Sequence, residues 1–114
     1  MSIPRGSTRV ATLEIPVDFT GCTVFVTIDQ NGTQVTKKSS DSGIQITKHY
    51  DDDGVFDYST IAVYLTQADT LTFEVGQAEI QARWVNYLGQ ADVSSVGTIT
   101  LDRVLLEREI AYGE

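Results

Sequence analysis

The sequence predicts an all-β sandwich of about seven antiparallel strands, with one short helical turn near residues 66–71. Fourteen Thr, twelve Val and nine Ile make up almost a third of the 114 residues, and such β-branched side chains fit a pleated sheet better than a helix. Apolar and polar residues alternate with period two along most segments, which is typical of half-buried strands. Turn residues recur about every ten residues, as in a sandwich or small barrel.

In the N-terminal half, this alternation predicts four strands, over residues 8–15, 22–29, 34–38 and 43–49. Asn31 and Gly32 stand between the second and third of these segments. This dipeptide accepts the positive φ values of a type I′ turn, so the third segment should fold back on the second as a hairpin.

In the C-terminal half, an acidic turn at residues 51–54 precedes a strand over 61–65. Residues 66–71 are predicted to form the helical turn, capped by Thr66, with Asp69 in the acidic position of a capping box. A long strand over residues 77–88 follows, carrying Ala78, Ile80, Ala82, Trp84 and Asn86 on one face.

After a turn at residues 88–90, a final strand is predicted over 93–106, and its apolar residues change phase. Ile99 and Leu101 share one parity, whereas Val104 and Leu106 share the other. A bulge near residues 102–103 would let both pairs face the core. A short C-terminal helix is the alternative, and the sequence does not decide between them.

Length and charge restrict organisation and partners. The chain fits one domain over residues 1–114, with residues 1–7 as a loose N-terminal arm. Sixteen acidic and eight basic residues give a formal charge of −8, which disfavours nucleic acid and anionic membranes as partners. No apolar run approaches the roughly 18 residues of a membrane span, and no secretory signal is expected.

A buried Trp84 near the middle of a long strand fits a core between two sheets, so an immunoglobulin-like sandwich is favoured. Cys22 is the only cysteine, which excludes the Cys–Trp–Cys spacing of antibody domains and an internal disulfide. The likeness is therefore one of architecture. Cys22 itself, on an alternating strand, is interpreted as a small buried apolar residue.

The acidic loop offers a weak candidate metal site. Asp41, Asp51, Asp52, Asp53 and Asp57 lie close in sequence, and calcium prefers carboxylate oxygens. Asp51, Asp53 and Asp57 are the weak candidate ligands. Three adjacent Asp residues before a Gly are more often a solvated turn, which is the favoured interpretation, and no metal or other cofactor is expected.

The sequence contains no recognisable catalytic motif. His49 would need a nucleophile such as Ser59 or Ser42, and no G-x-S-x-G elbow or comparable motif is present. We therefore expect a surface histidine and no enzymatic activity. Tyr50, Phe56, Tyr58 and Tyr64 could hold a sugar beside the loop, so a binding module for calcium or carbohydrate at residues 49–58 is the alternative function. Core packing is the favoured role of these rings.

The edges and the C-terminal segment are the candidate interaction surfaces. The first strand is rich in Thr and Val, and only Pro4 and Pro16 flank it to protect its edge. The segment 101–110 is apolar with charges at its rim, and either could pair with another chain. The candidate interaction residues are Leu101, Val104, Leu105, Leu106 and Ile110. The alternative is that both segments only close the sandwich.

Residues 61–73 carry the pattern V-x-L-T-Q-x-x-T-L-x-F, which resembles a segment of short proteins from phage and prophage structural gene clusters of Gram-positive bacteria. Residues 76–84, with Gly89, Ser94 and Ser95, continue the likeness, and residues 24–28 with 35–37 are similar to the first hairpin of that family. The order of elements also resembles the N-terminal immunoglobulin-like domain of siphophage upper baseplate proteins.

This resemblance implies a non-enzymatic structural or accessory protein, associated with the tail, baseplate or virion, that acts through protein–protein assembly. Its implied partners are other phage structural proteins and further copies of the chain. Its implied location is the virion, or the host cytoplasm before assembly. The loop at residues 51–58 departs from the family pattern. The long helical extension of the upper baseplate proteins is missing, which favours a stand-alone accessory protein.

Overall fold

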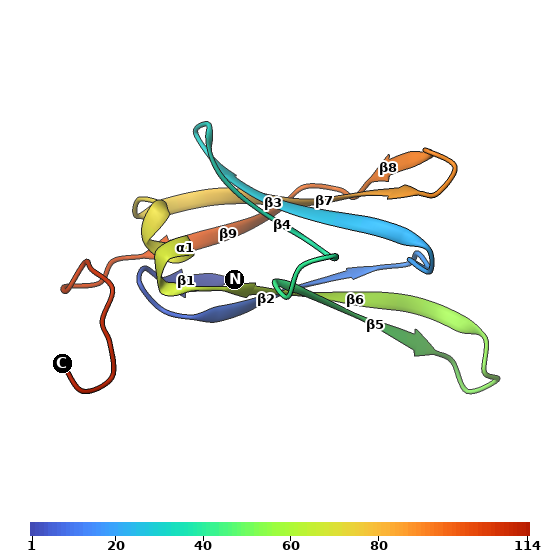
Figure 1. Ribbon diagram of the computed structural model, residues 1–114, viewed down its shortest axis with the longest axis horizontal. Coiled ribbons are helices and arrows are strands. Elements are labelled where there is room, and N and C mark those ends of the chain that lie inside the picture. The colour runs from blue at the N-terminus through green and yellow to red at the C-terminus, as the bar shows by residue number, and fades with distance from the viewer.

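The computed structural model describes all of residues 1–114 as two β-sheets packed face to face (Figure 1). The smaller sheet has the order β2–β6–β5, and the larger has the order β1–β9–β7–β3–β4, with β8 also paired to β7. The strands of the larger sheet are β1 (Ser2–Pro4), β3 (Cys22–Gln30), β4 (Thr33–Lys38), β7 (Gly76–Asn86), β8 (Ala91–Val93) and β9 (Gly97–Asp102). Those of the smaller sheet are β2 (Arg9–Ile15), β5 (Ile44–Tyr50) and β6 (Phe56–Leu65).

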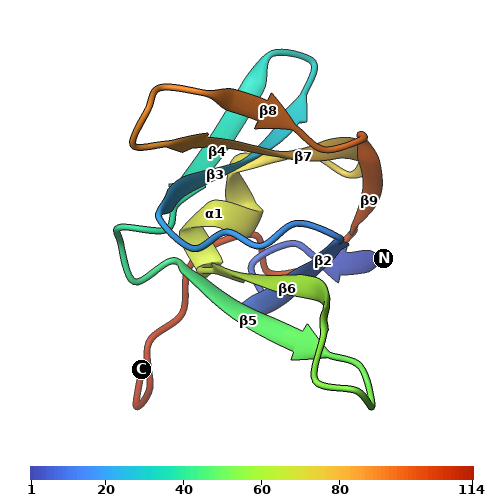
Figure 2. The ribbon, with the colours of Figure 1, turned by 90° about the vertical axis from the view of Figure 1, so that its right-hand side faces the viewer.

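This arrangement confirms the predicted all-β sandwich. A β2–β6–β5 sheet corresponds to strands B, E and D of a variable-type immunoglobulin domain, and β9–β7–β3–β4 corresponds to G, F, C and C′. Every strand pair is antiparallel except β1 with β9, which run parallel. Figure 2 shows the two layers end-on, with β3, β7 and β8 above β2, β5 and β6.

The core lies between the sheets and follows the period-two alternation of the sequence. Along β3, Val24, Val26 and Ile28 are buried while the intervening residues are more exposed. β6 and β7 repeat the pattern, and their innermost side chains are Ile61, Val63, Leu65, Ala78, Ile80 and Ala82. The inward faces predicted from the sequence are therefore confirmed.

Two local predictions are also confirmed. Asn31 and Gly32 take φ values of 52° and 92°, as a type I′ turn requires, and they join β3 to β4. The helical turn is α1 (Gln67–Thr72), and its capping box is complete. The Asp69 backbone N–H donates to Thr66 Oγ1 at 3.1 Å, and the Thr66 N–H donates to Asp69 Oδ2 at 2.8 Å.

The predicted loose N-terminal arm is wrong. Residues Ser2–Pro4 form β1, which pairs with β9, and Ile3 is only 1% exposed. A strand of three residues is too short to show an alternation, so the sequence carried no signal for it. Pro4, which lacks an N–H, is accommodated because β1 is an edge strand.

The predicted strand over residues 93–106 is confirmed only in part, over β9, whereas the bulge near residues 102–103 and the helix alternative are both wrong. β8 and β9 are separate strands, and β9 ends at Asp102. Between them the chain leaves the ladder at Ser94, whose N–H donates to Ala82 O at 2.9 Å and whose hydroxyl accepts from Ala82 N–H at 3.0 Å. Residues 103–114 form an irregular tail without helix or strand (Figure 1).

Trp84 is less buried than predicted. It lies near the end of β7, is only partly buried, and packs edge-to-face on Phe19 with ring centroids 5.0 Å apart. Cys22, expected to be buried, is also only partly covered. Both residues lie at the end of the sandwich where β3 begins, so the core is thinner there than the sequence pattern indicates.

Candidate functional site

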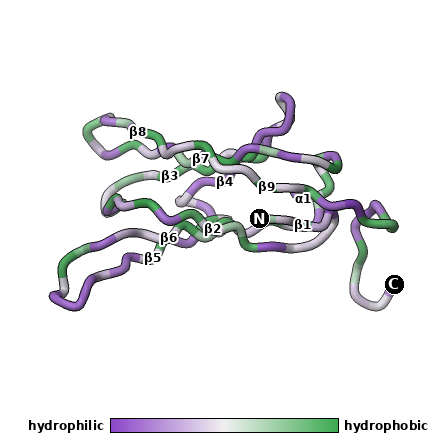
Figure 3. Tube along the Cα trace, turned by 180° about the vertical axis from the view of Figure 1, so that it is seen from behind, coloured by the Kyte–Doolittle hydropathy of each residue, from purple (hydrophilic) through white to green (hydrophobic).

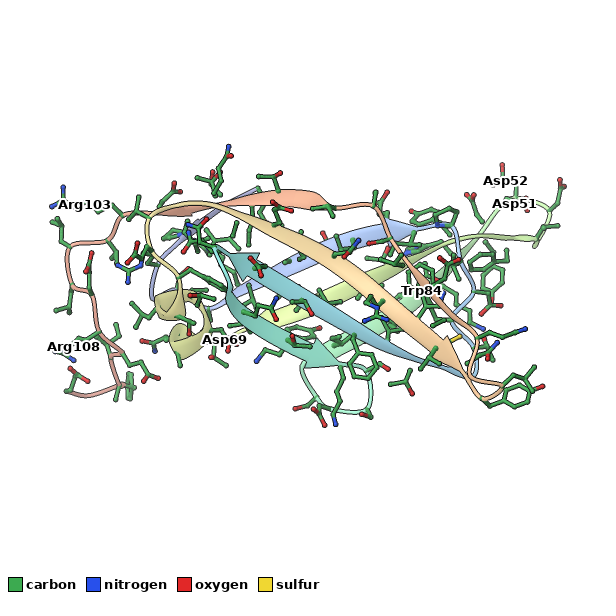
Figure 4. The ribbon with its side chains drawn as sticks, turned by 90° about the horizontal axis from the view of Figure 1, so that it is seen from above. Asp51, Asp52, Asp69, Trp84, Arg103 and Arg108 are labelled. Carbon is green, nitrogen blue, oxygen red and sulfur yellow. The ribbon has the colours of Figure 1, made fainter.

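The acidic loop at the β5–β6 hairpin uses its carboxylate internally. Asp51 Oδ1 accepts the backbone N–H groups of Asp53 and Val55, each at 2.9 Å. Asp51 and Asp52 lie at the outer tip of the hairpin (Figure 4). The structure does not gather Asp51, Asp53 and Asp57, or any other group of three acidic, His or Cys side chains, into a set that could hold a metal ion. The arrangement is that of a self-capped turn.

The structure does not bring His49 together with either serine named above. The His49 ring stacks on Tyr58 with centroids 4.4 Å apart, and its Nε2 lies 2.8 Å from Thr60 Oγ1. Ser59 is fully buried, and its hydroxyl donates to Val17 O at 2.8 Å. Ser42 is exposed and has no hydrogen bond to His49. His49 is half-buried rather than a free surface residue.

The four loop-side aromatic residues fall into separate groups. His49 stacks on Tyr58, and Tyr50 packs edge-to-face on Phe56 at 6.4 Å. Tyr64 lies further along β6 on the outer face, as predicted, and its hydroxyl donates to Gln45 Oε1 at 2.8 Å. These rings order the hairpin rather than converge on one ligand.

The C-terminal tail exposes several large apolar side chains. Leu105, Leu106 and Ile110 are 89%, 53% and 54% exposed. Tyr112, which the sequence analysis missed, is fully exposed. The prediction of Leu101 as an interaction residue is wrong, because Leu101 lies on β9 and is only 1% exposed. Figure 3 shows hydrophobic and hydrophilic stretches alternating along the tail, which projects beyond the sheets.

Arg5, in the turn between β1 and β2, anchors the first part of this tail. Its Nη1 pairs with Glu107 Oε1 at 3.0 Å, while its Nε donates to Phe73 O at 2.6 Å and its Nη2 donates to Leu71 O at 3.3 Å. One nearly buried guanidinium therefore satisfies carbonyls at the C-terminal end of α1 and fixes the tail. Sequence reasoning missed it because its partners are more than 60 residues away.

Gln67, at the start of α1, holds the second part. Its side-chain Nε2 donates to Ile110 O at 2.9 Å, and its Oε1 accepts from Ile110 N–H at 2.8 Å. The amide thus pairs with the Ile110 backbone as a neighbouring strand would. A hollow of about 250 Å³ remains between the tail and the turn after β1, lined in part by Pro4, Val104 and Leu106.

Further along the tail, the chain folds back on itself. The Ala111 N–H donates to Glu114 Oε2 at 2.7 Å, and Arg108 pairs with the same carboxylate. The hydrogen bond from the Ala111 N–H, and after it the hydrogen bond from Arg108, lower the pKa of Glu114 below its usual range. Several polar groups of the tail therefore contact one another or the domain, while Leu105 and Tyr112 are exposed to solvent and Leu106 and Ile110 are about half-exposed.

Comparisons of the chain with models of protein families, with curated proteins and with solved structures find no match. The single helix, α1, is six residues long, and no helix could cross a membrane.

Proposed function

We propose that this chain is a structural or accessory protein of a phage or prophage particle, without enzymatic activity, that works by protein–protein assembly. The observation that carries the proposal is the anchored tail, which presents Leu105, Leu106, Ile110 and Tyr112 to solvent. The resemblance of residues 61–73 to proteins of phage structural gene clusters supports the setting. A tail or baseplate position, and residence in the host cytoplasm before assembly, belong to the same proposal.

The physical basis is the free energy of apolar burial. Burying a leucine or isoleucine side chain gains about 1.5–3 kcal/mol relative to leaving it exposed. Leu105, Leu106 and Ile110 together offer several kcal/mol to a partner surface, and Arg5 and Gln67 reduce the entropy lost on binding by ordering the tail beforehand. The expected partners are other structural proteins of the particle and copies of this chain.

The first test compares three chains by light scattering from about 1 to 100 µM: the full chain, a chain ending at Asp102, and Leu105→Asp. We expect the full chain to form a larger species than the other two. Leu105→Asp is the sharper variant, because the side chain is 89% exposed and the fold should be unaffected. Leu88→Asp, at an exposed leucine on the β7–β8 turn, is the matched control and should behave as the full chain does.

Equal masses for the full chain and Leu105→Asp would contradict assembly through the tail. The particle assignment has its own test, in which the strain that encodes the chain is induced and its particles are purified on a density gradient. We expect peptides of the chain to sediment with the particles. Their absence from particles that contain the other tail proteins would overturn the assignment.

A further inference from the structure

The outer face of the larger sheet carries its charges in rows. The pairing register of β4, β3 and β7 places Lys38, Phe25 and Arg83 side by side. Two residues further along, on the same face, the row consists of Thr36, Thr27 and Gln81, and the next consists of Gln34, Asp29 and Glu79. A positive row and a negative row therefore flank an uncharged one.

None of these four charges has an oppositely charged partner within the chain. Lys38, Arg83 and Glu79 are exposed and form no ion pair. Asp29 Oδ2 accepts from Gln34 Nε2 at 2.8 Å, and its Oδ1 accepts from Gly32 N–H at 3.2 Å. These two bonds hold the pKa of Asp29 below its usual range, so the row stays negative.

We propose that this face packs on the same face of a second copy, around a two-fold axis that runs along the row of Thr36, Thr27 and Gln81. Such an axis in the interface plane exchanges the two charged rows. Arg83 of each copy then faces Glu79 of the other, so the contact is made twice. Lys38 of each copy faces the row of the other copy that contains Asp29.

The charge of the remaining surface favours this orientation over others. The two positive and two negative residues of the face sum to zero, so the whole formal charge of −8 resides elsewhere. The face itself adds no like-charge repulsion to the contact, whereas a contact between two acidic surfaces would add it. A hollow of about 420 Å³ at the positive end, lined by Phe25, Val85 and Ala91 among others, adds apolar area.

The available area sets the expected strength. Strands lie about 4.8 Å apart and successive rows of one face about 6.8 Å apart, so the three rows across β4, β3 and β7 cover on the order of 300 Å² per copy. A standard interface buries about 800 Å² per partner. The dimer is therefore weak, and it should be sought between about 10 µM and 1 mM.

A charge exchange tests the geometry directly, with sedimentation velocity as the readout. Arg83→Glu places acidic residues opposite one another twice, and Glu79→Arg does the same with basic residues. Each variant alone should raise the dimer Kd at least tenfold. An equimolar mixture of the two should form a heterodimer, and the double variant R83E/E79R should recover dimerisation, because opposite charges face one another again in both cases.

Arg9→Glu and Glu14→Arg are the matched controls. Both residues are exposed on the smaller sheet, make no ion pair, and change the net charge by the same amounts. Their dimer Kd should stay within about twofold of the parent. Three results would overturn the proposal. The parent chain could be monomeric at every concentration, the controls could raise the dimer Kd as much as the test variants do, or the mixture of the two test variants could stay monomeric. Leu105→Asp should still dimerise, which separates this face from the tail.

Discussion

Arg5 is the single residue on which most of the tail geometry depends. Its side chain is 14% exposed, and its guanidinium reaches Leu71 O, Phe73 O and Glu107. We expect Arg5→Met to lower the free energy of unfolding by about 2–3 kcal/mol, because hydrogen bonds to charged groups are worth about 1.5–3 kcal/mol and the carbonyls lose their donor. Urea denaturation followed by Trp84 fluorescence measures the change.

The ion pair alone should matter much less. Glu107 is half-exposed, and exposed pairs contribute about 0–1 kcal/mol. Glu107→Gln is therefore the control, with an expected loss below about 0.5 kcal/mol. Equal losses for the two variants would mean that Arg5 stabilises the fold only through the tail, and not through the end of α1.

At the residue scale, what the sequence predicted correctly was local. Asn31 and Gly32 specify their turn by their own conformational preferences, and Thr66 and Asp69 cap a helix from three residues apart. Arg5 and Gln67 act through residues far along the chain, and no local pattern marks them. Trp84 was placed on the right face, but its depth depends on where β7 ends relative to Phe19.

Among the elements, α1 is tied to the larger sheet by an ionised carboxylate. Asp69 Oδ2 accepts from Thr66 N–H at 2.8 Å and lies 2.7 Å from Lys37 Nζ on β4. Partial burial raises the pKa of Asp69, but the hydrogen bonds from Lys37 and Thr66 outweigh this effect, and the pKa lies below its usual range. The charged form therefore stabilises the folded state.

The sign of the pH dependence follows from that lowered pKa. The stability that Asp69 contributes is present in full above the unfolded-state pKa of about 3.9 and is lost as the pH falls through the lower folded-state pKa. We expect Asp69→Asn to cost about 1 kcal/mol at pH 7, and much less near pH 2. Denaturation curves of both chains between these pH values measure the difference.

Glu74→Gln provides the matched acid-to-amide control. Glu74 is exposed, and its side chain makes no hydrogen bond or ion pair. The Glu74→Gln variant should therefore have the same stability as the parent chain at every pH. A difference between the parent and Asp69→Asn that persists unchanged at pH 2 would show that the substitution acts by disturbing α1 and not by removing the charge.

The length of a strand determined whether it could be predicted from the sequence. β2, β3, β5, β6 and β7 are long enough for period two to appear, and their inward faces are confirmed. β1 and β8 have three residues each, so no alternation can distinguish them from loops. The tail was mistaken for a strand because Val104 and Leu106 continue the alternation in the opposite phase. That phase change marks the end of β9.

At the scale of the whole molecule, the two proposed surfaces have different symmetry. The face of the larger sheet is self-complementary and closes after two copies. The tail lies at the end of the sandwich beside α1 and β1, away from that face (Figure 1). A tail that docks on a different surface of its partner makes a heterologous contact, which extends into rings or larger assemblies. Together the two proposed surfaces would build a larger assembly from dimers.

This independence can be tested with one pair of substitutions. Leu105→Asp removes the tail contact and should leave a dimer of twice 12.5 kDa at high concentration. Arg83→Glu removes the face contact and should leave only the species that the tail forms. The double variant L105D/R83E should be a monomer at every concentration, as measured by light scattering.

The size of the combined effect decides whether the surfaces cooperate. Distant sites without shared partners add within about 0.3–0.5 kcal/mol, so the loss in the double variant should equal the sum of the two single losses. A larger assembly that disappears completely with either substitution would mean that the tail binds only to dimers. In that case its docking surface would be formed jointly by two copies, and the face of the larger sheet would control assembly.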